Sequence, residues 1–296
     1  MSSIIECLES SVEKLDRKNP LFHGFITFLR DHGISQNVRR IFNDVSMKKN
    51  CKIINDQMKA SKVFFELHED DVEQCKKMLA DDISREIYEA SIRFRISHNL
   101  KDRPSFDMRN QYFPDDIISL SEGEVFIDCG AFLGEAVLEI KKRTNNTFKR
   151  IVCFEPDEMS FKRLQNAFNE SNVIIYNAGV WESSTVLHMD CTGLSSSKID
   201  TEDNGGQAIQ VYSIDSLEEC ADATYIKMDI EGSEYSALFG AEKTIRKNRP
   251  KLAICIYHLD EDYIRIIQWI NNLNMGYKFF VRHHNCSIYD TVLYAI

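Results

Sequence analysis

The stretch VFIDCGAFLGE (125–135) joins an apolar run, an acid and two glycines. The apolar run has the length and composition of a buried strand, and it ends at Asp128. Gly130 and Gly134 then permit a sharp turn into a helix that begins near Glu135, and they let the backbone of the turn pass close to a ligand. The stretch therefore predicts a strand, a glycine loop and a helix, which form the first part of a βαβ unit.

From residue 124 onward, short β-rich runs alternate with helical patterns, which predicts βαβ units and a mostly parallel sheet. The last two strands are joined by a short polar turn, so they form a hairpin and one of them runs antiparallel to the rest. The polar, turn-rich segment 192–207 is expected to be a loop, either a substrate-side insertion or a linker. The expected strands are EVFID (124–128), RIVCF (150–154), VIIYN (173–177), TYIKM (224–228), KLAICI (251–256), YKFFVRHH (277–284) and IYDTVLYAI (288–296), and the expected helices cover 135–146, 157–170, 233–248 and 260–273.

The first part of the chain has a different pattern. Apolar residues at helical spacing predict helices at 20–33, 70–79 and 84–97, and no cluster of catalytic type accompanies them. The sequence therefore predicts a helical N-terminal region over 1–112 and an α/β domain over 113–296.

Composition excludes several classes of protein. The 296 residues carry a formal net charge of −10, which argues against binding of nucleic acid or anionic membrane by bulk electrostatics. No apolar run approaches the ~20 residues of a membrane span, and the first residues lack the pattern of a signal peptide. The nine cysteines include no CxxC pair, so we expect reduced thiols in a cytoplasmic protein, with neither zinc nor disulfides.

An acid after the second strand, Glu155, is placed to accept hydrogen bonds from ribose hydroxyls, which favours an adenosine-containing cofactor. NAD and S-adenosylmethionine both meet this description. A pyrophosphate calls for the close approach of GxGxxG, whereas this loop reads GxxxG with the bulky Phe132 inside it. Asp128 and Glu135 add negative charge beside the loop, which suits the ammonium and sulfonium groups of S-adenosylmethionine better than a diphosphate. A tight turn without a ligand is the alternative interpretation.

The stretch KMDIEGSE (227–234) follows the fourth strand of the predicted parallel set, so Asp229 and Glu231 lie at the carboxyl edge of the sheet, where ligands bind in such folds. Two acids at this spacing have three interpretations that the sequence leaves open. They cap a turn, they hold the methionine end of the cofactor, or they bind a divalent metal.

At these motifs the sequence resembles the FkbM-type S-adenosylmethionine-dependent methyltransferases. The resemblance implies a Rossmann-like methyltransferase fold with a seven-stranded, mostly parallel sheet and a C-terminal antiparallel hairpin. It also implies O-methylation of a hydroxyl on a sugar, a glycan or a small metabolite, without fixing the acceptor. It runs in order over 111–296 and is carried by QYF (111–113), FIDCGAFLGE (126–135), FEPD (154–157), KMDIEGSE (227–234), ALFGA (237–241), RPKLAICIYH (249–258), RHH (282–284) and TVLYA (291–295).

The site residues expected from these motifs fall into two groups. His258, at the end of the fifth strand, is the candidate proton acceptor because imidazole titrates near neutral pH, and Asp229 is expected to position the cofactor or orient the acceptor. A satisfied core histidine is the alternative for His258. Many relatives have Asn or another polar residue where this chain has Phe132. A contact between the cofactor and the backbone at this position would not depend on the side chain. The residues expected to contact the cofactor are Asp128, Gly130, Ala131, Phe132, Gly134, Glu155, Pro156, Asn177 and Asp229, and the metal candidates are Asp229 and Glu231.

Two other functions compete with methyl transfer. A nicotinamide-dependent sugar oxidoreductase or epimerase usually needs GxGxxG and a Tyr-x-x-x-Lys pair, and no convincing pair follows the third or fourth strand. A non-catalytic cofactor-binding module, in which the helical region binds a partner, is the third hypothesis. The sequence predicts a small-molecule or glycan acceptor and leaves the oligomeric state open.

Overall fold

The computed structural model describes residues 54–189, 199–200 and 207–296, so the helix expected at 20–33 and most of the loop expected at 192–207 lie outside the described residues. Phe64–Ile296 form one compact unit. No helix among the described residues is long and apolar enough to cross a membrane. Among the described cysteines, Cys75, Cys129, Cys153, Cys220 and Cys255 are buried thiols.

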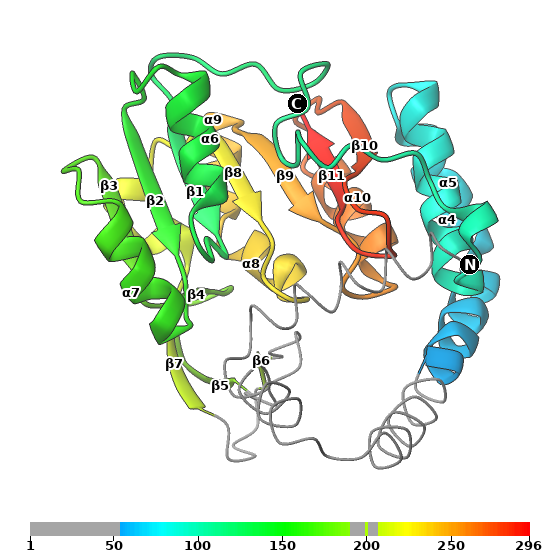
Figure 1. Cartoon of the computed structure of the whole chain (residues 1–296). Coiled ribbons are helices and arrows are strands. Elements are labelled where there is room, and N and C mark those ends of the chain that lie inside the picture. Colours follow the sequence, from blue (N-terminus) through cyan, green and yellow to red (C-terminus); the bar gives the residue numbers. More distant parts are fainter. Residues whose placement is uncertain (1–53, 190–198, 201–206) are drawn as a thin grey trace, which may run out of the picture. The chain divides into compact units, whose positions relative to one another are not determined.

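A seven-stranded sheet forms the centre of this unit, in the order β3-β2-β1-β8-β9-β11-β10. The five strands from β3 to β9 are parallel, while β11 runs antiparallel to both β9 and β10. This confirms the predicted methyltransferase-type sheet with its antiparallel hairpin (Figure 1). The strands are β1 (Val125–Cys129), β2 (Arg150–Phe154), β3 (Val173–Tyr176), β8 (Tyr225–Met228), β9 (Lys251–Cys255), β10 (Phe279–His283) and β11 (Thr291–Ala295).

Helices cover both faces of the sheet (Figure 1). On one face, Val137, Ile140 and Leu164 from α6 (Glu135–Arg143) and α7 (Glu158–Ala167) pack in one apolar cluster with inward residues of β1 and β2. On the other face, α8 (Glu234–Phe239), α9 (Glu242–Asn248) and α10 (Asp262–Asn272) pack in a second cluster with β8 and β9. The single helix expected at 233–248 is two helices, because α8 ends at Phe239 and α9 begins at Glu242.

The β10 edge of the sheet is covered by the turn between α4 (Glu69–Met78) and α5 (Asp82–Ser97). The side chain of Asp81 caps α5 by accepting from the N–H of Ser84 at 2.6 Å, and Ser84 Oγ accepts from the N–H of Val281 at 2.9 Å. The guanidinium of Arg282 lies 2.8 Å from Asp81 and ties the strand to the cap. These contacts occupy groups of an edge strand that would otherwise be open to another chain. The two helices thus pack on the same sheet as the α/β part of the chain.

A second, smaller sheet is inserted in the chain between β3 and β8, and sequence analysis did not predict it. Its order is β4-β7-β5-β6. Among the side chains that the structure describes, Ile209 and Val211 form its buried cluster, with Trp181 and Leu187 packed against them. Such short strands with so little burial give a weak periodic signal. Its strands are β4 (Gly179–Val180), β5 (Thr185–Met189), β6 (Ile199–Asp200) and β7 (Gln207–Tyr212).

Candidate functional site

The glycine loop between β1 and α6 is shaped by three residues with positive φ. Gly130 and Gly134 have φ of 81° and 86°, and Phe132 between them has 48°. A Cβ on Gly130 would overlap the carbonyl oxygen of Asp229, and one on Gly134 would overlap the ring of Phe168. The sequence predicts close approach to a ligand, whereas the structure shows close approach to the protein itself. Gly130 lets the loop lie directly against the turn that follows β8.

Glu155 joins this loop to the end of β2. Its Oε2 accepts from the N–H of Phe132 at 2.7 Å, and its Oε1 accepts from the N–H of Asp157 at 2.9 Å. The residue is 7% exposed, and this burial raises the pKa of its carboxyl. Asn177 continues the edge, because its amide donates to the carbonyl oxygens of Glu155 and Pro156 at 3.0 and 3.1 Å. The predicted residues at the ends of β1, β2 and β3 are therefore brought together.

Asp128 is fully buried and faces Lys227, its register partner in β8. The ammonium of Lys227 lies 2.9 Å from Oδ1 of Asp128, although neither carboxylate oxygen makes a hydrogen bond of good geometry within the described part of the chain. Burial lowers the pKa of Lys227, but the nearby Asp128 and Asp229 outweigh it and raise that pKa above its usual value. Lys227 also donates to the carbonyl oxygen of Gly130 at 2.7 Å. The charge of Asp128 is thus compensated, so Asp128 adds little net negative charge beside the loop.

Asp229 is held by two tyrosine hydroxyls that sequence reasoning missed. Tyr112 donates to Oδ2 at 2.7 Å and Tyr257 donates to Oδ1 at 3.0 Å. Burial raises the pKa of Asp229, but Lys227, His258 and the hydroxyls lower it below its usual range. Tyr112 lies within the QYF segment ahead of β1, and Tyr257 directly precedes His258. The sequence offered one indication of these two tyrosines, namely that each lies beside a motif of the predicted site.

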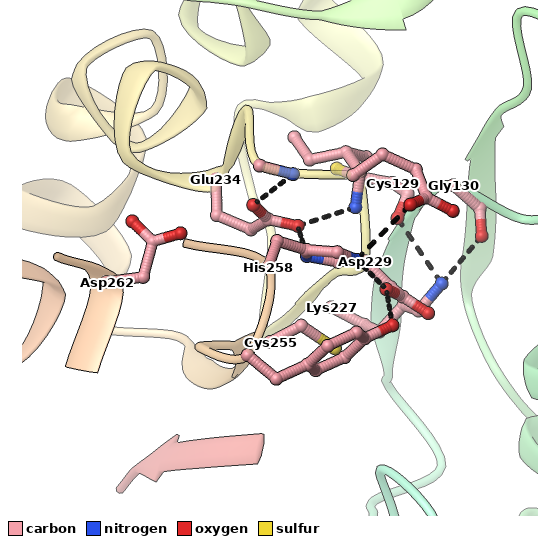
Figure 2. A network of polar contacts seen from close by, with 12 residues as sticks. Cys129, Gly130, Lys227, Asp229, Glu234, Cys255, His258 and Asp262 are labelled. Atoms are coloured by element: carbon pink, nitrogen blue, oxygen red, sulfur yellow. Dashed lines mark hydrogen bonds and ion pairs between the residues drawn. The ribbon is translucent and has the colours of Figure 1, made fainter. Parts of the chain in front are cut away.

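His258 lies among carboxylates (Figure 2). Its Nδ1 is 2.9 Å from Oε1 of Glu234, and its Nε2 is 3.5 Å from both Asp229 and Glu231. Burial alone lowers the pKa of His258, but Glu234, Asp229 and Glu231 raise it to about 9. The predicted position beside Asp229 is present. The premise that this imidazole titrates near neutral pH is wrong, because the carboxylates stabilise the imidazolium.

Glu234 is a further residue whose role the sequence did not reveal. Its fully buried carboxylate accepts from the N–H groups of Ile230 and Gly232 at 2.7 and 2.9 Å. Glu231 in this turn has φ of 58°, a conformation that is uncommon for residues other than glycine and needs such support, whereas Gly232 adopts its φ of 96° readily. Glu234 therefore fixes the turn after β8 and contacts His258 from the same side chain.

Among the described residues, ligand atoms of Asp229, Glu234 and His258 lie within 4.8 Å of one another. Glu231, a metal candidate in the sequence analysis, is not in this group. Backbone amides bind the oxygens of Glu234, and tyrosine hydroxyls bind those of Asp229. These contacts do not support the metal that the sequence left open.

Comparison with known proteins identifies the class to which this arrangement belongs. Residues 128–279 match the model of the methyltransferase FkbM domain. The matched residues make up more than half of the chain. No curated protein sequence matches significantly. The crystal structure of the methyltransferase FkbM from Methylobacillus flagellatus KT aligns with a TM-score of 0.69 and 27% identity, covering 79% of this chain. The alignment covers 60% of that protein, so this chain spans less than two thirds of its length.

Two other solved structures align with lower TM-scores. Fibrillarin from Aeropyrum pernix, in complex with natively bound S-adenosyl-L-methionine, aligns with a TM-score of 0.39 and 12% identity, covering 61% of this chain and 70% of that one. An rRNA methylase from Streptococcus thermophilus aligns with a TM-score of 0.38 and 12% identity, covering 60% and 87%. These two are too distant to inform the chemistry here. The match to the domain model, together with the sheet order, shows that the chain belongs to the FkbM methyltransferase family.

Proposed function

We propose that this protein is an S-adenosylmethionine-dependent O-methyltransferase that modifies a hydroxyl of a sugar, a glycan or a small metabolite. One observation carries the proposal. The glycine loop, Glu155 and the Asp229 turn meet at the carboxyl edge of β1, β2 and β8, where the strand order changes direction. Ligands bind at this crevice in open α/β sheets. Membership of the family supports methyl transfer as the reaction.

The residues at this edge have separate roles in binding the cofactor. The carboxylate of Glu155 retains lone pairs beyond those used by Phe132 and Asp157, so it can accept from ribose hydroxyls. The N–H of Phe132 is already donated to Glu155, so we assign its backbone contact with the cofactor to the carbonyl oxygen. Asp128 acts indirectly, since it holds Lys227 against the loop. Asp229 supplies the negative charge for the cationic methionine end.

Methyl transfer from a sulfonium is an in-line displacement, in which the new O–CH₃ bond forms as the S–CH₃ bond breaks and S-adenosylhomocysteine leaves. Alignment of the three atoms lowers the barrier. A neutral hydroxyl is a weak nucleophile, so its proton must pass to a base as the bond forms. His258 and Asp229 are the candidates. His258 accepts a proton only in its neutral form, which its pKa of about 9 disfavours in the cofactor-free protein.

The test of this function is transfer of a labelled methyl group. The full chain is incubated with methyl-labelled S-adenosylmethionine and matched acceptors that differ in one group, such as a sugar, its deoxy analogue and its amino analogue. We expect label on the sugar that keeps the hydroxyl and none on its deoxy or amino analogue. Mass spectrometry of the labelled product should show a methyl ether. Label on the amino analogue in preference to the hydroxyl would contradict O-methylation.

Replacement of Glu155 by alanine is expected to weaken S-adenosylmethionine binding by about 1–3 kcal/mol, because a charge-assisted acceptor is lost. Calorimetric titration of the folded variant measures this change. The exposed Glu158, three residues along on α7, provides the control, and Glu158→Ala should bind normally. Equal affinities in the two variants would mean that Glu155 does not contact the ribose.

A further inference from the structure

We propose that Glu234 and His258 form a proton-holding pair that releases its proton when the cationic cofactor binds beside Asp229, so that His258 becomes the proton acceptor only in the cofactor-bound enzyme. This inference rests on the proposed function and adds an order of events to it. Glu234 is then a positioning residue, since it acts through His258 and through the turn after β8.

The geometry of the pair is the first step. The side chain of His258 is 9% exposed and that of Glu234 is fully buried, with Nδ1 and Oε1 2.9 Å apart. Neither ring nitrogen of His258 makes a hydrogen bond of good geometry with a described residue. The proton is thus held by charge more than by a directed hydrogen bond. Such a proton responds strongly to a new charge nearby.

The charges around the imidazole are predominantly negative, and they come from three elements. Asp229 and Glu231 face Nε2 from the turn after β8, and Glu234 faces Nδ1 from α8. Asp262 approaches from α10, and its pKa is raised to about 7 by burial and by Glu234, against the opposing effect of Arg265 (Figure 2). Two cations lie nearby: Lys227 acts on Asp229, and Arg95 donates to the carbonyl oxygen of His258 at 3.3 Å. The rings of Tyr257 and His258 have their centroids 4.0 Å apart.

Cofactor binding changes this balance. The glycine loop touches Asp229, so a methionine end held by the loop and Asp229 brings its sulfonium close to the same carboxylates that stabilise the imidazolium. A positive charge beside these carboxylates is expected to lower the pKa of His258 by about 1 to 2. S-adenosylhomocysteine lacks the sulfonium charge, so it should lower the pKa much less.

The proton balance over one turnover is closed. Binding of S-adenosylmethionine releases the imidazolium proton to solvent. The acceptor hydroxyl then passes its proton to the neutral imidazole while the O–CH₃ bond forms and the S–CH₃ bond breaks. The sulfonium becomes a neutral thioether, and the regenerated imidazolium is again stabilised by the carboxylates. The same residues therefore hold the proton before and after the reaction and lose it only when the donor is charged.

Calorimetry measures this linkage without an acceptor. Titrations near pH 8, in two buffers with different ionisation enthalpies, give the number of protons released per bound cofactor. We expect roughly half a proton for S-adenosylmethionine and clearly less for S-adenosylhomocysteine. His258→Gln should abolish the difference between the two ligands, and Glu234→Gln should reduce it. His188→Gln, in β5 of the second sheet, should leave it unchanged.

A second measurement follows the titration in the unaltered protein and needs a variant only to assign the signal. The His258 ring signal, assigned by its absence in His258→Gln, is titrated by NMR with and without S-adenosylmethionine. A pKa that falls by about 1 to 2 on binding would support the inference. An unchanged pKa, or equal proton release by the two ligands, would overturn it while S-adenosylmethionine binding still supports the proposed function. Failure of S-adenosylmethionine to bind at all would overturn both.

Discussion

Gly130→Val is expected to abolish S-adenosylmethionine binding and methyl transfer, with a loss of at least 100-fold in affinity, or about 3 kcal/mol. Gly130 has φ of 81°, a conformation that β-branched residues avoid. Its added Cβ would also overlap the carbonyl oxygen of Asp229, so the glycine loop and the turn after β8 must separate. Calorimetric titration with the cofactor measures the loss, and circular dichroism checks that the variant is folded.

Two other glycines separate the causes of this effect. Nothing lies within 4 Å of a Cβ built on Gly123, and its φ is not in the left-handed region, so Gly123→Val should bind normally. Gly276 has φ of 70° with open space around it, so Gly276→Ala should cost about 1 kcal/mol of stability and leave binding intact. If Gly130→Val binds as tightly as these two controls, the glycine loop is not the cofactor site.

Lys227→Met is expected to lower the free energy of unfolding by about 3–5 kcal/mol, because Asp128 is left as an uncompensated charge in the interior. The two side chains are 4% and 0% exposed, so solvent cannot replace the ammonium. Urea denaturation measures the change. The double variant with Asp128→Leu should recover part of the loss, since it removes the orphaned charge.

The control for this prediction is an exposed pair. Lys162 and Glu158 on α7 are each 63% exposed, and Lys162→Met should change stability by less than about 0.5 kcal/mol. Lys227→Met should also weaken cofactor binding, because Lys227 donates to the carbonyl oxygen of Gly130 in the loop. A stability loss as small as that of the control would show that the buried pair does not hold β1 against β8.

The large sheet could be predicted from the sequence because most of its strands are short apolar runs, and the helices between them show the helical spacing of apolar residues. The small sheet was not predicted because β5 and β7 show only a weak alternation of apolar and polar residues. Their hydrogen-bonded pairing with each other stabilises them instead. The position of Asp229 and His258 at one edge followed from topology alone, since adjacent parallel strands end at the same side. Sequence reasoning was effective where the spacing of apolar residues decides whether a segment forms a strand or a helix.

The chemistry within the site depends on relations that no local pattern encodes. The compensation of Asp128 follows from its register with Lys227 across β1 and β8. The raised pKa of His258 follows from Glu234, whose carboxylate reaches the ring only because the turn after β8 folds back on α8. The hydroxyl of Tyr112 reaches Asp229 from a segment ahead of the first strand. Strand register and the convergence of distant segments set these contacts, so the structure was needed to find them.

The most direct measurement is a calorimetric titration of the full chain with S-adenosylmethionine, S-adenosylhomocysteine and NAD⁺ under the same conditions. We expect the first two to bind at one site per chain with a Kd on the order of micromolar, and NAD⁺ to show no binding. Glu155→Ala should weaken both of the ligands that bind. Binding of NAD⁺ without binding of either methionine-derived ligand would contradict the assignment of this edge of the sheet to S-adenosylmethionine.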